Sequence, residues 1–254
     1  ALSAVLVLIV LTRSQSMYRV EWRRVRLHGR MLRTICAIGM PPALQQAVTS
    51  FSNVFVQAYI NQFGSACMAG WTSYGKIDQF ALLPSQAIAL STTTFVGQNL
   101  GAGNVKRAKT GLARAMTIAF IATAILITPL MIFPRQLISM FNTDPEVLRY
   151  GELFIRVISP FYLLCAVNQN YSGALSGAGD TLAPMVIMLG SFVVFRQIYL
   201  FVTTRLIGTL LPVALGYPVG WVLCSIAIVL YYHSGRWEKR RVVVRGHAQA
   251  GSSC

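Results

Sequence analysis

Long apolar runs alternate with short polar segments along most of this chain. Six of the runs are long enough to cross a bilayer as a helix, which takes about 20 mostly apolar residues. They are Ile35–Ile60, Trp71–Phe95, Leu112–Phe133, Leu153–Ala174, Pro184–Leu206 and Leu210–Tyr231. A shorter run occupies Ala1–Leu11. Because the runs are continuous and do not alternate, they predict membrane-spanning helices and not the strands of a barrel.

The composition supports the same interpretation. The chain is 55% hydrophobic and 11% charged, whereas soluble domains carry about 25% charged residues. We therefore expect an all-α protein, a polytopic membrane helical bundle. It should contain six full transmembrane helices, preceded by the end of another helix.

The positive charge of the chain lies mostly in three polar segments. The formal net charge is +15, and most of the basic residues fall in Arg13–Arg33, Lys106–Arg114 and Arg236–Arg245. The spans between these segments would bring all three to one side of the membrane. Loops rich in Lys and Arg face the cytoplasm, so the charge reports topology, and no nucleic-acid partner is expected.

These patterns predict four parts of the chain. The first basic segment, Arg13–Arg33, could be a helix lying on the inner leaflet or a solvated linker. The parts are residues 1–12, the end of a preceding helix; 13–34, a basic cytoplasmic linker; 35–232, a six-helix transmembrane lobe; and 233–254, a basic cytoplasmic tail.

The first full span carries a polar stripe. Gln46, Ser50, Asn53 and Gln57 are spaced by three or four residues, which places them on one face of a helix. Polar side chains are costly inside a bilayer unless they meet partners or water. The stripe therefore predicts either a hydrated cavity that binds a cation or substrate, or hydrogen bonds to neighbouring helices.

The second span holds the only acid well inside an apolar run, Asp78. Tyr74 shares its helix face, whereas Lys76 points elsewhere. A carboxylate at this depth suits binding of a proton, Na⁺ or an organic cation. The alternative is a structural ion pair near the outer interface.

Two arginines also lie within predicted spans, Arg156 and Arg196. Arg196 is near the middle of its run and should face the interior of the bundle, because a lipid-facing charge is unfavourable there. Its expected partner is Asp78 or carbonyls freed at the proline-broken helices. Lys76, Arg156 and Arg196 are thus the predicted intramembrane charge partners.

No catalytic or metal-binding pattern stands out in the sequence. The three histidines lie in loops or the tail, and the five cysteines lack metal-ligand spacing. We therefore expect no enzyme activity, no metal and no cofactor.

A polar, basic, glycine-rich segment, TFVGQNLGAGNVKRAK (Thr94–Lys109), separates two of the spans and predicts a tight cytoplasmic loop. Its motif residues are Gly97, Gln98, Asn99, Gly101, Gly103 and Asn104. Three further motifs are IGMPPALQQ (Ile38–Gln46), KIDQFALLP (Lys76–Pro84) and SGALSGAGDT (Ser172–Thr181). With these four motifs the chain resembles the C-terminal half of a MATE (multidrug and toxic compound extrusion) transporter.

The resemblance implies a protein of two six-helix lobes around a central cavity, which exchanges organic cations or drugs for H⁺ or Na⁺. It implies an N-terminal lobe of the same protein, the lipid bilayer and small organic cations as partners, and a multi-pass location in the cell membrane. Ser176 stands where many members have arginine.

The chain departs from the family in its acidic residues. Some members bind the coupling ion with acids in the first and fourth helices of this lobe, but Ile35–Ile60 and Leu153–Ala174 contain none. Coupling then falls to Asp78 or to the other lobe. Two further alternatives are a flippase for lipid-linked precursors and a non-transporting fragment or scaffold.

Overall fold

The computed structural model describes Ile9, Thr12 and residues 29–239. Regular structure in this part of the chain is entirely helical, which confirms the predicted class. The chain divides into two units, Ala1–Ala37 and Ile38–Cys254, and the core and the candidate site belong to the second. Most of the predicted linker and of the predicted preceding helix lie outside the described residues.

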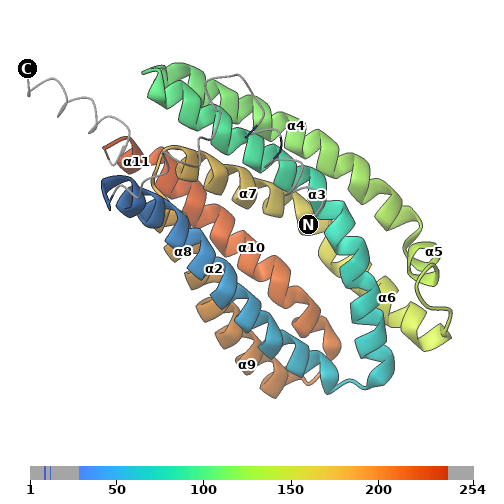
Figure 1. Ribbon diagram of the computed structural model, residues 1–254. Coiled ribbons are helices and arrows are strands. Elements are labelled where there is room, and N and C mark those ends of the chain that lie inside the picture. Colours follow the sequence, from blue (N-terminus) through green and yellow to red (C-terminus); the bar gives the residue numbers. More distant parts are fainter. Residues whose placement is uncertain (1–8, 10–11, 13–28, 240–254) are drawn as a thin grey trace, which may run out of the picture. The chain divides into compact units, whose positions relative to one another are not determined.

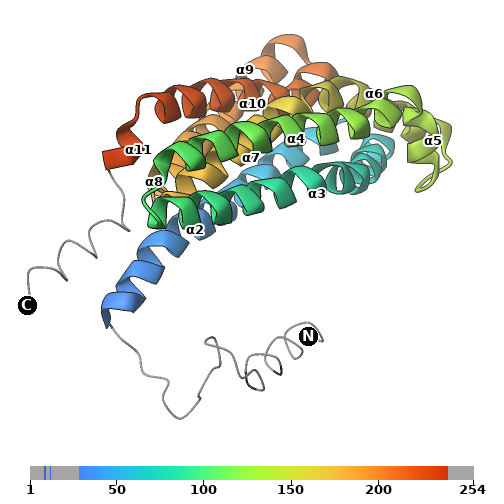
Figure 2. The ribbon, with the colours of Figure 1, turned by 90° about the horizontal axis from the view of Figure 1, so that it is seen from above.

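Six long helical stretches make up the bundle (Figures 1 and 2). Pro160 interrupts one of them with a 3-10 turn, and another contains a π-helical segment. The elements are α2 (Gly29–Asn61), α3 (Ser65–Gly101), α4 (Val105–Ile132), α5 (Pro134–Ser139), α6 (Pro145–Ile158), η2 (Ser159–Phe161), α7 (Tyr162–Gly177), α8 (Leu182–Leu189), η3 (Gly190–Phe195), α9 (Arg196–Ile207), α10 (Leu210–His233) and α11 (Arg236–Lys239).

Five of these stretches are long and apolar enough to cross a membrane. They correspond to the second through sixth predicted spans and are Ser65–Gly101, Val105–Ile132, Pro145–Gly177, Leu182–Ile207 and Leu210–His233. The first predicted span, Ile35–Ile60, does fold as part of a helix, α2. It is not among the five because amides and hydroxyls occupy much of its second half. Helix α2 also begins at Gly29, inside the segment predicted as linker.

The predicted loop over Thr94–Lys109 is wrong, because only Ala102–Asn104 separates α3 from α4. Gly97, Gln98 and Asn99 lie within α3, and Gly101 is its last residue. The turn itself uses Gly103, whose φ of +76° favours glycine. The Asn104 side chain then caps α4 by accepting a hydrogen bond from the Arg107 backbone N–H at 3.0 Å.

Helices α3 and α7 pack with their backbones in near contact. A Cβ atom at Gly173 would lie 2.6 Å from the carbonyl oxygen of Ala89, and one at Gly177 would lie 2.3 Å from that of Thr93. Small residues at such crossings allow the van der Waals packing that joins helices in lipid. Helix α7 continues through this crossing and ends at Gly177, within the motif Ser172–Thr181.

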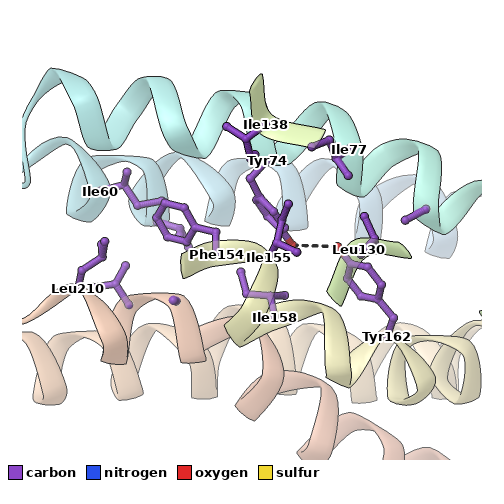
Figure 3. Packing of buried hydrophobic residues seen from close by; sticks show 14 of the residues in the cluster. Ile60, Tyr74, Ile77, Leu130, Ile138, Phe154, Ile155, Ile158, Tyr162 and Leu210 are labelled. Atoms are coloured by element: carbon purple, nitrogen blue, oxygen red, sulfur yellow. Dashed lines mark hydrogen bonds between the residues drawn. The ribbon is translucent and has the colours of Figure 1, made fainter. Parts of the chain in front are cut away.

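Two apolar clusters fill the bundle between the helices. One gathers around Phe154, Ile155 and Tyr162, with side chains from α2, α3 and α10 (Figure 3). The other lies around Leu100 and Leu175, toward the turn between α3 and α4. Outward-facing positions are also apolar, as expected for a surface in contact with lipid.

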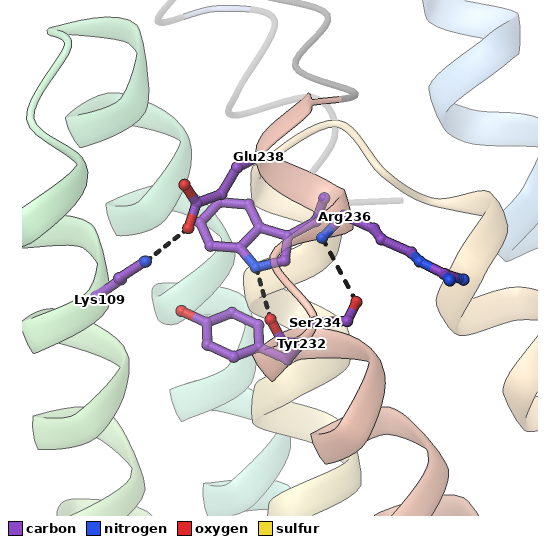
Figure 4. Close-up of polar contacts among 6 residues, drawn as sticks. Lys109, Tyr232, Ser234, Arg236 and Glu238 are labelled. Carbon is purple, nitrogen blue, oxygen red and sulfur yellow. Dashed lines mark hydrogen bonds and ion pairs between the residues drawn. The ribbon is translucent and has the colours of Figure 1, made fainter.

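The predicted tail begins with an ordered element, the short helix α11 (Figure 4). Trp237 is buried and stacks on Tyr232 with ring centroids 5.2 Å apart, and its Nε1 donates to the Tyr232 carbonyl at 3.0 Å. Lys109 Nζ lies 2.5 Å from Glu238 Oε1. These contacts join the end of α10 to the first turns of α4.

The α3–α7 crossing predicts the effect of one added methyl group. Gly177→Ala should lower the melting temperature of the purified full-length protein, because overpacking that displaces backbone costs about 1–3 kcal/mol. Gly190→Ala is the matched control, since a Cβ atom there meets nothing within 4 Å. Equal melting temperatures for the two variants would contradict the close crossing.

Candidate functional site

Polar side chains from several helices line a pocket of about 340 Å³ in the second unit. This volume falls within the range of small-molecule sites, about 300–1,000 Å³. The helices that contribute are α2, α3, α7, α10 and the continuous stretch from α8 to α9. Its polar lining residues are Gln45, Gln46, Thr49, Asn53, Tyr74, Asp78, Asn168, Gln169, Arg196 and Tyr217.

Asp78 is held by two tyrosine hydroxyls. Its Oδ1 accepts a hydrogen bond from Tyr162 at 2.5 Å and another from Tyr74 at 3.0 Å. The two hydroxyls are themselves 3.2 Å apart (Figure 3). Tyr74 lies one helical turn before Asp78, as predicted, whereas Tyr162 opens α7 and joins the site from a distant part of the sequence.

Arg196 faces the interior of the bundle, which confirms the prediction, and its exposed fraction is 3%. Its Nη2 donates to Ser52 Oγ at 2.8 Å and to Asn53 Oδ1 at 2.9 Å. The guanidinium carbon lies 4.8 Å from the centre of the Tyr217 ring. All three partners are neutral side chains of α2 and α10.

The predicted pairing of Arg196 with Asp78 is wrong. Both residues line the pocket, but in the described part of the chain no ion pair joins them. Asp78 is engaged by the tyrosines of α3 and α7, while Arg196 reaches across to α2. The alternative of freed helix-end carbonyls is also not what the structure shows, since Arg196 bonds to side chains.

The other predicted charge partners lie outside the pocket. Lys76 Nζ is 5.1 Å from the centre of the Phe141 ring, and its side chain points away from Asp78, as expected for a residue two positions apart on a helix. Arg156 pairs with Glu152 one turn earlier, with Nη2 and Oε1 2.9 Å apart. Both basic side chains are exposed.

The polar stripe of α2 is only partly turned toward the pocket. Gln46 and Asn53 line it, but Ser50 is exposed and outside it, and Gln57 bonds to Asn61 at 2.9 Å along the same helix. Three further polar residues of α2 face the bundle interior: Gln45 and Thr49 line the pocket, and Ser52 bonds to α9. The spacing shows that these residues share one broad face of the helix, but it does not show which of them line the pocket.

Asn168 and Asn170 of α7 are part of the buried interior, which the sequence analysis did not predict. Asn168 donates to the Trp221 carbonyl at 3.3 Å and accepts from Ser225 at 2.9 Å. Asn170 accepts from the Thr92 hydroxyl at 3.1 Å. The sequence did contain a signal for this burial: Asn168 and Asn170 both lie inside a predicted span, and amides in lipid require partners.

An aromatic wall borders the pocket and was also not predicted. The ring centroids of Trp71 and Tyr217 are 5.5 Å apart, and those of Tyr217 and Trp221 are 6.2 Å apart. Such faces can hold an aromatic body or a cation. In the described residues no group of three or more His, Cys, Asp and Glu side chains could hold a metal ion.

A bundle of membrane-crossing helices around a small polar pocket is an architecture of membrane transporters. The family model MatE matches residues 41–202, well over half of the chain, so the chain belongs to the MatE family. This confirms the resemblance found in the sequence motifs. Members of this family are transporters and not enzymes.

Curated relatives come from several bacteria. The "Probable multidrug resistance protein YpnP" of Bacillus subtilis is 29% identical over 82% of this chain and 46% of that protein. The "Probable multidrug resistance protein NorM" of Thermotoga maritima is 27% identical over 83% and 46%. The "FAD transporter" of Shewanella oneidensis is 27% identical over 60% and 34%. The chain thus spans about half the length of the curated relatives it matches.

Solved structures share the fold at low identity. An outward-facing multidrug resistance MATE family transporter has a TM-score of 0.84 at 19% identity, over 94% of this chain and 54% of that one. A MOP superfamily transporter from Pyrococcus furiosus, described as having a binding pocket of reverse polarity, has a TM-score of 0.86 at 19% identity, over 93% and 54%.

The hydrogen bond between Tyr162 and Asp78 gives a stability prediction. Hydrogen bonds to charged groups contribute about 1.5–3 kcal/mol, so Tyr162→Phe and Asp78→Asn should lower the melting temperature non-additively. Thermal melting of both single variants and the double variant measures this coupling. Lys76→Gln combined with Asp78→Asn is the control and should be additive; similar coupling in both pairs would contradict the described contact.

Proposed function

We propose that this chain is part of a secondary active transporter that exports organic cations or drugs in exchange for H⁺ or Na⁺. The observation that carries the proposal is the pocket, in which one carboxyl group lies among aromatic rings and amides within a membrane-spanning bundle. Family membership supports transport. The names of two relatives, both probable multidrug resistance proteins, support drugs as the cargo.

Asp78 is the proposed site of coupling. Within the described residues its carboxyl group bonds to hydroxyls, which can donate to a carboxylate and can also accept a hydrogen bond from the neutral acid. Binding of a proton or Na⁺ would change the charge of the pocket without breaking a salt bridge. A ligand that binds the inward and outward states with different affinities shifts their equilibrium, and this is the proposed link between ion and substrate.

The aromatic wall and Asp78 suit an organic cation together. Trp71, Tyr217 and Trp221 offer ring faces, and the carboxylate offers an opposite charge. Amides such as Gln46 and Asn53 add adaptable hydrogen bonds at the rim. A pocket of this kind binds by shape and charge more than by one specific contact, as multidrug binding requires.

The proposed partner is a second six-helix lobe of the same protein, in the cell membrane. Relatives are about twice as long as this chain, which supports a second lobe. The end of the bundle that carries Lys106–Lys109, at the start of α4, and Arg236, in α11, is proposed to face the cytoplasm, following the excess of positive charge.

One observation favours a second candidate, a flippase for lipid-linked precursors. The pocket contains a guanidinium group, and such precursors carry anionic phosphate groups. The pocket volume of about 340 Å³ is small for a lipid-linked headgroup, which favours the drug transporter.

Asp78→Asn is expected to abolish ion-coupled efflux of ethidium from cells that express the full-length gene, because the amide cannot exchange a proton or hold Na⁺ by charge. The measurement is fluorescence loss, with the H⁺ and Na⁺ gradients collapsed separately to identify the coupling ion. Glu152→Gln, a carboxyl change outside the pocket, should retain efflux. Normal coupled efflux in Asp78→Asn would refute the role of Asp78, and absence of efflux in the inserted wild type would refute the transporter proposal.

A further inference from the structure

Arg196 is a buried cation whose hydrogen-bond partners are all neutral. Its exposed fraction is 3%, and its Nη2 donates to Ser52 and Asn53. Its Nε is buried and has no hydrogen-bond partner in the part of the chain that the structure describes. In residues 29–239 no carboxylate lies within ion-pair distance of it. Arginine stays protonated in proteins, and a charge taken out of water requires compensation by an opposite charge or by polar groups.

The contacts to α2 do not account for the charge. Gln197, the next residue, donates to Ser52 Oγ at 2.9 Å and to the Ser52 carbonyl at 3.0 Å. A neutral amide therefore already joins α9 to α2 at the same point. If the only role of Arg196 were to hold these helices together, an uncharged donor would serve at a lower desolvation cost.

The position of Arg196 makes its charge available to the pocket. It lies on the pocket lining with Phe192 and Tyr217, whose ring faces the guanidinium. It also directly follows the π-helical segment η3 (Gly190–Phe195). Segments of this type occur often at functional sites.

We propose that Arg196 binds a carboxylate on the transported solute, an inference that rests on the proposed function and narrows its substrate class. The preferred solute is then an aromatic compound with both a positive group and a carboxylate. The aromatic body lies against the wall of Trp71 and Tyr217, the positive group faces Asp78, and the carboxylate faces Arg196. A guanidinium recognises a carboxylate through charge-assisted hydrogen bonds.

A pair of closely related dyes tests this assignment. One is a cationic xanthene dye that carries a free carboxylate, and the other is its methyl ester, which keeps the ring system and the positive charge. Efflux of each dye is measured in proteoliposomes that contain the full-length protein, with an imposed ion gradient. The variants are Arg196→Gln, Arg196→Lys and, as a matched control, Arg205→Gln.

Arg205 is a suitable control because it lies on the same helix and also rests on an aromatic ring. Its guanidinium carbon is 4.3 Å from the centre of the Phe201 ring, but it is exposed and outside the pocket. Arg196→Lys retains the positive charge but lacks the planar guanidinium group, which can donate two parallel hydrogen bonds to a carboxylate. It also keeps the proposal testable if Arg196→Gln fails to insert, which size-exclusion chromatography of each variant would reveal.

The proposal predicts that Arg196→Gln reduces efflux of the carboxylate dye about ten-fold more than it reduces efflux of the ester. Arg196→Lys should give an intermediate loss for the carboxylate dye, and Arg205→Gln none. Equal losses for both dyes in the Arg196 variants would overturn the proposal and assign Arg196 a structural role. Wild-type efflux of the ester alone would also overturn it, while leaving the transporter function intact. Failure of the wild type to move either dye would instead refute the proposed function.

Discussion

Each polar or charged side chain in the membrane-embedded part of this protein needs a partner inside the protein, because lipid offers none. Asp78 finds the hydroxyls of Tyr74 and Tyr162, which joins α3 to α7. Arg196 finds Ser52 and Asn53, which joins α9 to α2. The contacts of Asn168 join α7 to α10. These bonds link neighbouring helices, and they leave the space between them polar.

The separation of Asp78 and Arg196 follows from the same constraint. Had the two charges paired, the pocket would contain a closed salt bridge with little capacity to bind an ion or a solute. Each is instead stabilised by neutral groups on a different pair of helices. The carboxyl group and the guanidinium are therefore both on the pocket lining, with aromatic rings beside them. This arrangement requires helices that approach closely. At the crossing of α3 and α7, Gly173 and Gly177 allow the close approach because they have no side chain.

Much of the fold could be predicted from the sequence because apolar runs and helix periodicity are local properties. They located the helices, the face shared by Tyr74 and Asp78, and the inward direction of Arg196. Helix ends were less predictable, since all of Thr94–Lys109 except the turn Ala102–Asn104 is helical through backbone hydrogen bonds and packing that composition does not report. The partners of Arg196 and the burial of Asn168 depend on contacts between residues more than 50 positions apart. A single sequence does not contain that information. Ser50 was predicted to line the cavity, but its neighbour Thr49 does so instead.

Reaction of introduced thiols with a charged, membrane-impermeant reagent tests most directly whether the polar faces of these helices enclose a hydrated pocket. In a full-length protein without its native cysteines, Thr49→Cys lies on the pocket lining, whereas Phe51→Cys lies on the opposite side of α2 and is exposed on the apolar surface. We expect rapid labelling at position 49, slowed by substrate, and little labelling at position 51, where lipid excludes water and the reagent. Labelling at position 51 with none at position 49 would contradict the hydrated pocket.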